Sequence, residues 1–214
     1  MQQLSIYSGV AIIFIGILLV VASFISIGKV QTWDKAEALS LDSRRPVRRI
    51  GMLIAAIGLA ALISALPTAV ATVFHTPGFN TAVIGWVLFS FSVILFFMVM
   101  GLTNIVLPAL GDLAVQDQVS PQKIVDVFTK QPAIIAAFLG GNLMYISWGI
   151  LGYGLLRSGI FMPWLGWTMI VCGLTGWLSF LHVPIFQQFG FPLWPASVIA
   201  LGVGLVRLGI STIQ

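Results

Sequence analysis

Carboxylates are the side chains that most often relay protons or bind cations inside a membrane, and this 214-residue chain contains six of them. All six fall in two polar connections between long apolar segments: Asp34, Glu37, Asp42, Asp112, Asp117 and Asp126. Proton-coupled transporters and redox pumps normally need ionisable groups at membrane depth. Because the apolar segments hold no carboxylate, the sequence argues against ion-coupled transport.

Two histidines supply further acid–base and metal-ligating groups. We expect His75 at the outer end of the second apolar segment and His182 at the inner end of the fifth, so one haem or metal ion could not bind both. A histidine at a helix end is more often an interfacial hydrogen-bonding group. The sequence also lacks a paired-cysteine spacing, a phosphate-binding glycine loop and a GxSxG motif. We therefore predict no catalytic residue and no metal site, while the cofactor question stays open.

Two arginines, Arg157 and Arg207, stand apart from the other bases. Arg207 lies 13 residues after Trp194, or about 20 Å along a helix, which places it within the hydrocarbon. One interpretation is that its side chain snorkels to the outer headgroups. The other is a buried cation that no outer Asp or Glu can neutralise, leaving backbone carbonyls, the terminal carboxylate of Gln214, a lipid phosphate or another subunit as its partner. The same alternatives apply to Arg157.

Polar and small residues recur at helical spacing in the fourth and fifth apolar segments. The fourth carries Asn142 near its middle with Tyr145 one turn on, and the fifth carries Thr168, Cys172 and Thr175. Glycines accompany both sets: Gly149, Gly152, Gly166, Gly173 and Gly176. Small residues let helix backbones approach closely in a bilayer. We expect the two segments to pack tightly through a polar seam that Asn142 bridges with a hydrogen bond.

This seam can be interpreted as structure or as a ligand site. As structure, each interhelical hydrogen bond would contribute about 0.6 to 2 kcal/mol. As a ligand site, Trp148 and Trp177 would wall a pocket and stack on a flat hydrophobic molecule. The candidate ligand or partner residues are therefore Asn142, Tyr145, Trp148, Thr175, Trp177, Arg157 and Arg207.

Composition indicates which elements position these residues. The chain is 59% hydrophobic and 7% charged, whereas about a quarter of the residues in soluble domains are charged. Uncharged apolar runs of roughly 20 residues match the hydrocarbon core of a bilayer. We predict an all-α transmembrane helix bundle that forms a single domain over residues 1–214. Its six spans are expected at 5–27, 50–73, 81–103, 133–156, 164–181 and 193–211.

The basic residues indicate how the bundle is oriented. Six of the ten Lys and Arg residues lie in the connection after the first span, and two more lie in the third connection. Because short basic loops stay in the cytoplasm, we expect both termini outside. The run of Arg44, Arg45, Arg48 and Arg49 either signals topology alone or also binds anionic lipid headgroups, at about 1 kcal/mol per base.

Two further features are expected at the membrane surfaces. Ser120 and Pro121 can start a short helix that lies on the inner surface, near residues 121–130. Aromatic side chains are expected to anchor the spans at the headgroups. They are Tyr7, Trp86, Trp164 and Trp167 at the outer interface, and Trp33, Trp177 and Trp194 at the inner one.

The segment GYGLLRSGIFMPWLGWTMIVCGLTGWLSF contains a short Arg157-Ser158-Gly159 turn followed by Pro163-Trp164-Leu165-Gly166. It resembles the corresponding turn in a family of uncharacterised bacterial six-helix integral membrane proteins. The resemblance covers the last third of the chain. It implies six helices and carries over no chemistry.

Two classes of function remain open from these patterns. The first is a small non-enzymatic membrane protein that acts as an accessory subunit of a membrane complex or binds lipid or another hydrophobic ligand. The alternative is a small facilitator or channel for a neutral or anionic solute, with a path lined by Asn142, Tyr145, Thr175 and Arg207. Expected partners are membrane lipids, other membrane subunits or a second copy of the chain, and no nucleic acid. A bacterial inner membrane or a thylakoid would fit equally.

Overall fold

The computed structural model describes residues 2–26, 46–101, 132–180 and 190–211, with side chains described within 3–22, 49–98, 139–178 and 193–211. These ranges contain the helices α1 (Gln2–Ser26), α3 (Pro46–Thr72), α4 (Phe79–Gly101), α7 (Pro132–Ser158), α8 (Pro163–Phe180) and α10 (Gly190–Ser211). Turns at 73–78 and 159–162 join α3 to α4 and α7 to α8. The all-α prediction is confirmed for the described residues.

Four of the helices contain stretches that are long and apolar enough to cross a membrane. They are Gln3–Ala22 in α1, Arg49–Thr72 in α3, Phe79–Met98 in α4 and Leu193–Ser211 in α10. These stretches overlap four of the predicted spans, and α7 and α8 overlap the other two. Apolar chains become helical in lipid because a helix satisfies its own backbone hydrogen bonds. The predicted surface helix near 121–130 lies outside the described residues.

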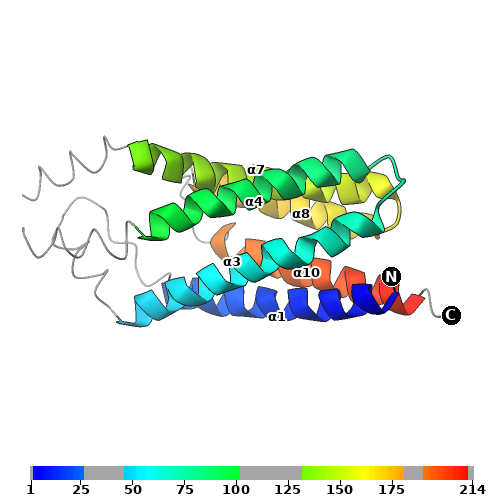
Figure 1. Ribbon diagram of the computed structural model, residues 1–214, viewed down its shortest axis with the longest axis horizontal. Coiled ribbons are helices and arrows are strands. Elements are labelled where there is room, and N and C mark those ends of the chain that lie inside the picture. Colours follow the sequence, from blue (N-terminus) through cyan, green and yellow to red (C-terminus); the bar gives the residue numbers. More distant parts are fainter. Residues whose placement is uncertain (1, 27–45, 102–131, 181–189, 212–214) are drawn as a thin grey trace, which may run out of the picture.

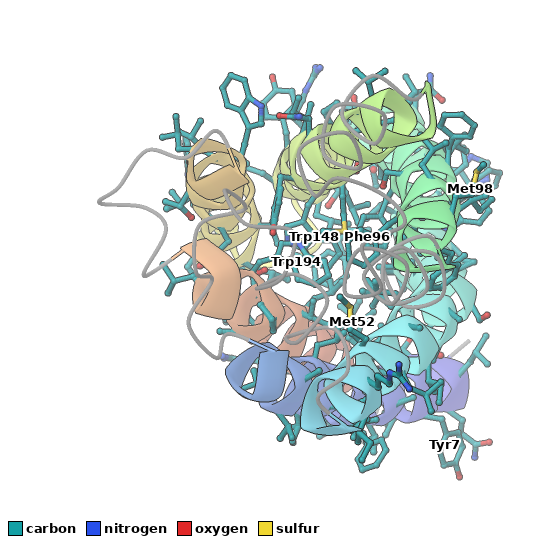
Figure 2. All side chains as sticks on the ribbon, turned by 90° about the vertical axis from the view of Figure 1, so that its left-hand side faces the viewer. Tyr7, Met52, Phe96, Met98, Trp148 and Trp194 are labelled. Carbon is teal, nitrogen blue, oxygen red and sulfur yellow. The ribbon has the colours of Figure 1, made fainter. Side chains whose placement is uncertain are left out.

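The helices stand side by side along the long axis of the molecule and form a ring (Figure 1). Each helix packs against two neighbours, in the order α1, α3, α4, α7, α8, α10 and back to α1. Figure 2 looks along this ring from the end where α1 finishes and α3 begins. The ring brings together α1 and α10, which are the helices furthest apart along the described chain.

The two described turns reverse the chain within a few residues. In the α3–α4 turn, His75 adopts a left-handed backbone with φ of 65°, and the Thr76 hydroxyl donates to the Val73 carbonyl at 2.6 Å. In the α7–α8 turn, Gly159 takes the left-handed position with φ of 68°, and Pro163 begins α8. Left-handed residues commonly end helices, and proline is favoured at the first helical position. The short connection predicted between the fourth and fifth spans is confirmed, but Arg157 and Ser158 belong to the last turn of α7 and only Gly159 lies in the turn.

Close backbone contacts hold neighbouring helices together. A Cβ added to Gly9 on α1 would lie 2.7 Å from the carbonyl oxygen of Gly202 on α10. A Cβ added to Gly85 on α4 would lie 2.5 Å from the backbone nitrogen of Leu151 on α7. Lipid tails are as apolar as the side chains of membrane helices, so dispersion contacts of this kind supply much of the association energy between spans.

The ring is apolar on its outside as well as its inside. The inner face is formed by side chains such as Ile12, Leu62 and Leu201, which are completely buried. The outer face exposes residues of the same kinds, including Phe14 and Ile57. A bundle whose helices are hydrophobic all round is typical of a protein that is solvated by lipid.

Candidate functional site

An aromatic cluster occupies the centre of the ring. It consists of Phe89 on α4, Tyr145 and Trp148 on α7, and Trp194 on α10, all buried. Ring centroids lie 5.4 Å apart for Phe89 and Trp148, 5.5 Å for Trp148 and Trp194, and 6.1 Å for Phe89 and Trp194. Since α4 and α10 stand on opposite sides of the ring, this central aromatic cluster crosses its full width (Figure 2).

A single serine joins two of the helices that carry the cluster. Ser197 Oγ on α10 accepts a 2.8 Å hydrogen bond from Trp148 Nε1 on α7 and donates a 2.6 Å bond to the Trp194 carbonyl. Sequence reasoning missed Ser197, because one serine within an apolar run carries no spacing signal. Its position three residues after Trp194 fits the common serine bond to a preceding helical carbonyl.

The indole of Trp194 has an unusual position for a polar group. Its ring is 5% exposed, and within the described part of the chain Nε1 has no hydrogen-bond partner. Trp86 Nε1 is likewise buried without a partner among those residues, and its side chain packs against the core. The prediction of Trp194 as an inner anchor is therefore wrong, whereas Trp86 is partly buried and stays a predicted outer anchor. A buried donor left unpaired costs about 1 to 3 kcal/mol.

The predicted close packing of the fourth and fifth spans is confirmed. A Cβ on Gly173 of α8 would lie 2.7 Å from the Tyr145 carbonyl oxygen on α7, and one on Gly176 would overlap the Tyr145 ring. The threonines do not contribute a polar seam, however. Thr168 donates to the Trp164 carbonyl at 2.8 Å and Thr175 to the Val171 carbonyl at 2.9 Å, so both bonds stay within α8.

The remaining candidates of the seam have different environments. Trp148 is completely buried and belongs to the central aromatic cluster. Trp177 is partly buried and packs against the hydrophobic core from its border. Asn142 is half-buried on α7, three residues before Tyr145. Thr175 is half-buried on α8. The two predicted walls of a ligand pocket therefore have different places: Trp148 lies at the centre of the ring and Trp177 lies at the border of the core.

Arg207 is exposed near the end of α10. Its Nη1 lies 3.3 Å from Met162 Sδ in the α7–α8 turn, and the Trp164 indole nitrogen lies 3.2 Å from the same sulfur. Contact with a turn residue places the guanidinium near the end of the bundle. Exposure in the single chain is compatible with both interpretations of Arg207, because a lipid phosphate or another subunit would meet it from outside.

Arg157 is also exposed, in the last turn of α7. Its guanidinium carbon lies 6.0 Å from the centre of the Tyr153 ring, one turn earlier on the same helix. A cation near a helix C-terminus interacts favourably with the helix dipole, and a cation over an aromatic ring gains further attraction. Both interactions favour an exposed arginine at this position of α7.

The structure describes only part of the predicted run of four arginines. Arg44 and Arg45 lie outside them, Arg48 lies in the first turn of α3, and the side chain of Arg49 is exposed. Helix α3 begins at one end of the bundle and α10 finishes at the other (Figure 1). Arg49, near the start of α3, therefore lies at the opposite end from Arg207, which is near the finish of α10.

The aromatic side chains at the centre of the ring pack against one another, and Arg207 lies far from them. Tyr145 lies 13 residues before the end of α7, so its ring is about 20 Å along the helix from the turn that contacts Arg207. The part of the chain that the structure describes has no group of three His, Cys, Asp or Glu residues that could hold a metal ion. Comparison with protein-family models, curated proteins and solved structures gave no match, so this geometry alone carries the functional argument.

Proposed function

We propose that the chain is a six-span integral membrane protein that binds a lipid, another hydrophobic molecule or a membrane subunit at its outer surface and catalyses no reaction. The observation that carries this proposal is the central aromatic cluster. Phe89, Trp148 and Trp194 contact one another across the width of the ring, so its axis is filled at that depth. Binding is then a property of the surface that faces the membrane, which is apolar and carries exposed arginines near both ends.

The path of the chain supports six spans with both termini on one side. The start of α1 and the end of α10 lie at the same end of the bundle, together with both described turns (Figure 1). The first turn of α3, with Arg48 and Arg49, lies at the other end, beside the basic connection. By the positive-inside rule that end is cytoplasmic, and both termini are outside. A bacterial inner membrane and a thylakoid both fit.

A facilitator would need a different conformation from the one described here. Its path would pass Tyr145, which packs beside Gly176 and makes an edge contact with Trp194 at 6.4 Å. Solute passage would have to displace these buried aromatic rings. Each such ring loses dispersion contacts on moving, because packed interiors leave few voids.

The test is purification from native membranes in a mild detergent, followed by mass spectrometry of lipids and proteins. We expect one lipid class, enriched over the bulk membrane, or one subunit whose own purification recovers this chain. A parallel measurement follows solute flux in proteoliposomes, with protein-free liposomes as the control. A chain that elutes alone without enriched lipid would contradict the proposal, and so would flux that Asn142→Leu abolishes.

A further inference from the structure

We infer that the outer surface around Arg207, Met162 and Trp164 binds the phosphate of an anionic phospholipid. We call these three residues the Arg207 patch. The inference rests on the proposed membrane insertion and names the lipid chemistry that one part of the surface would recognise.

The hydrogen bonding of Arg207 is incomplete within the described residues. A guanidinium has five N–H donors in a planar fork. The one hydrogen bond formed by Arg207 among those residues goes to Met162 Sδ at 3.3 Å. A thioether sulfur is a weak acceptor, and here it is shared with the Trp164 indole, whose nitrogen lies 3.2 Å away. Most of the donor capacity of Arg207 is therefore left for a partner outside the bundle.

The surroundings of Arg207 require that partner to be amphipathic. Its neighbours on the same face of α10, Val203 and Ile210, are 45% and 51% exposed. Trp164 and Trp167 add exposed indole rings from α8. A soluble anion would satisfy the charge alone and would make no contact with these apolar groups. A phospholipid presents its phosphate to the arginine and its acyl chain to the apolar residues below.

The depth of the Arg207 patch fits the headgroup region. Met162 belongs to the turn between α7 and α8, which lies at an end of the bundle (Figure 1). Tryptophan indoles are favoured at this level, where the ring contacts acyl chains and the N–H meets polar groups. Arginine binds a phosphate through two parallel hydrogen bonds. Phosphatidylcholine carries that phosphate too, so an anionic phospholipid differs from it in the net charge of the headgroup.

The charge distribution points to an anionic lipid. The described residues include no Asp or Glu, because all six carboxylates of the sequence lie in 27–45 and 102–131. Arg157, the other exposed arginine near this end, faces the ring of Tyr153 instead. Arg207 is therefore a cation whose local acceptor is a neutral sulfur, and a lipid headgroup with a net negative charge complements it better than a zwitterionic one.

The experiment measures lipid retention by native mass spectrometry. The full-length chain is reconstituted in nanodiscs of phosphatidylglycerol and phosphatidylcholine in equal amounts, and the ratio of the two lipids that stay bound is compared between variants. Arg207→Gln should lower the preference for phosphatidylglycerol about fivefold, the factor expected for one base near an anionic surface. Arg157→Gln is the matched control and should leave the preference close to that of the unaltered chain. Circular dichroism checks that each variant is folded.

Two further measurements test which part of the lipid the Arg207 patch recognises. Trp164→Phe keeps the aromatic ring and removes the N–H that shares the sulfur, so the preference should persist. Added inorganic phosphate should not displace the lipid, because it offers no acyl chain. Equal losses for the Arg207 and Arg157 variants, displacement by inorganic phosphate, or no preference in the unaltered chain would each overturn the inference. None of these readouts depends on a partner subunit or on solute flux, so the proposed function is tested separately.

Discussion

Trp148 Nε1 lies 2.8 Å from Ser197 Oγ, and this hydrogen bond joins α7 to α10 across the inner side of α8. Both residues are completely buried. The bond therefore operates where water cannot replace either partner, and its loss is expected to be measurable.

Ser197→Ala should destabilise the bundle by about 1 to 2 kcal/mol, because it leaves the Trp148 N–H unpaired in an apolar interior. The measurement is the free energy of unfolding in mixed micelles with increasing denaturing detergent. Ser64→Ala is the control, since Ser64 is exposed and donates to the Ala60 carbonyl in its own helix. Equal stability of the two variants would contradict this role of Ser197.

Trp148→Phe should destabilise the bundle more than Trp194→Phe, although the chemical change is the same. Both substitutions shorten a buried aromatic ring and leave a similar cavity, which lowers the stability of each variant. Trp148→Phe also removes the donor of the hydrogen bond to Ser197, which should add about 1 kcal/mol to the loss. Trp194→Phe removes an N–H that has no partner among the described residues, so no such loss is added. Equal losses for the two variants, measured as the free energy of unfolding, would contradict this difference.

Gly202→Ala should weaken the contact between α1 and α10 by about 1 to 3 kcal/mol, the range for overpacking a tight interface. Its new Cβ would lie 2.6 Å from the Gly9 carbonyl oxygen, a backbone atom that cannot rotate away. Gly149→Ala is the matched control, because a Cβ there meets nothing within 4 Å. Thermal unfolding of the purified variants in detergent tests this, and a destabilised Gly149→Ala would refute it.

The two left-handed turn residues should respond oppositely to substitution. Gly159→Ala should cost about 1 kcal/mol, because a Cβ at its φ of 68° is strained although space is open around it. His75→Gly should stabilise the bundle by up to about 1 kcal/mol, since it relieves the same strain at a φ of 65°. The same unfolding measurement applies, and a loss of stability in His75→Gly would show that the histidine makes a compensating interaction.

The sequence predicts the helices and one of their contacts because those depend on local signals. Run length and charge locate the helices, and the glycines of the fourth and fifth segments indicate the approach of Gly173 to Tyr145. The rotation of each helix was not predictable. Ile12 is buried and Ile17 is exposed on the same helix, so hydrophobicity does not distinguish the inner face from the lipid face. Trp194 is predicted at an interface because it stands at the start of the sixth span, and that position does not show which way its ring points.

The sequence also does not show which residue a polar side chain bonds when that residue lies far along the chain. Ser197 and Trp148 are 49 residues apart, and neither residue type indicates the other. By contrast, the bonds of Thr168 and Thr175 to carbonyls four residues earlier follow from local helix geometry. The polar seam was expected because spacing shows which residues share a face but not where each hydroxyl points.

The contact between α1 and α10 also constrains the order in which the bundle can assemble. Gly9 and Gly16 receive backbone and side-chain atoms of α10, including those of Gly202 and Ile199. If the chain inserts into a membrane as proposed, these positions of α1 face lipid until α10 follows. A chain stalled before residue 190 would then leave α1 open to other membrane helices that carry small residues at the same spacing.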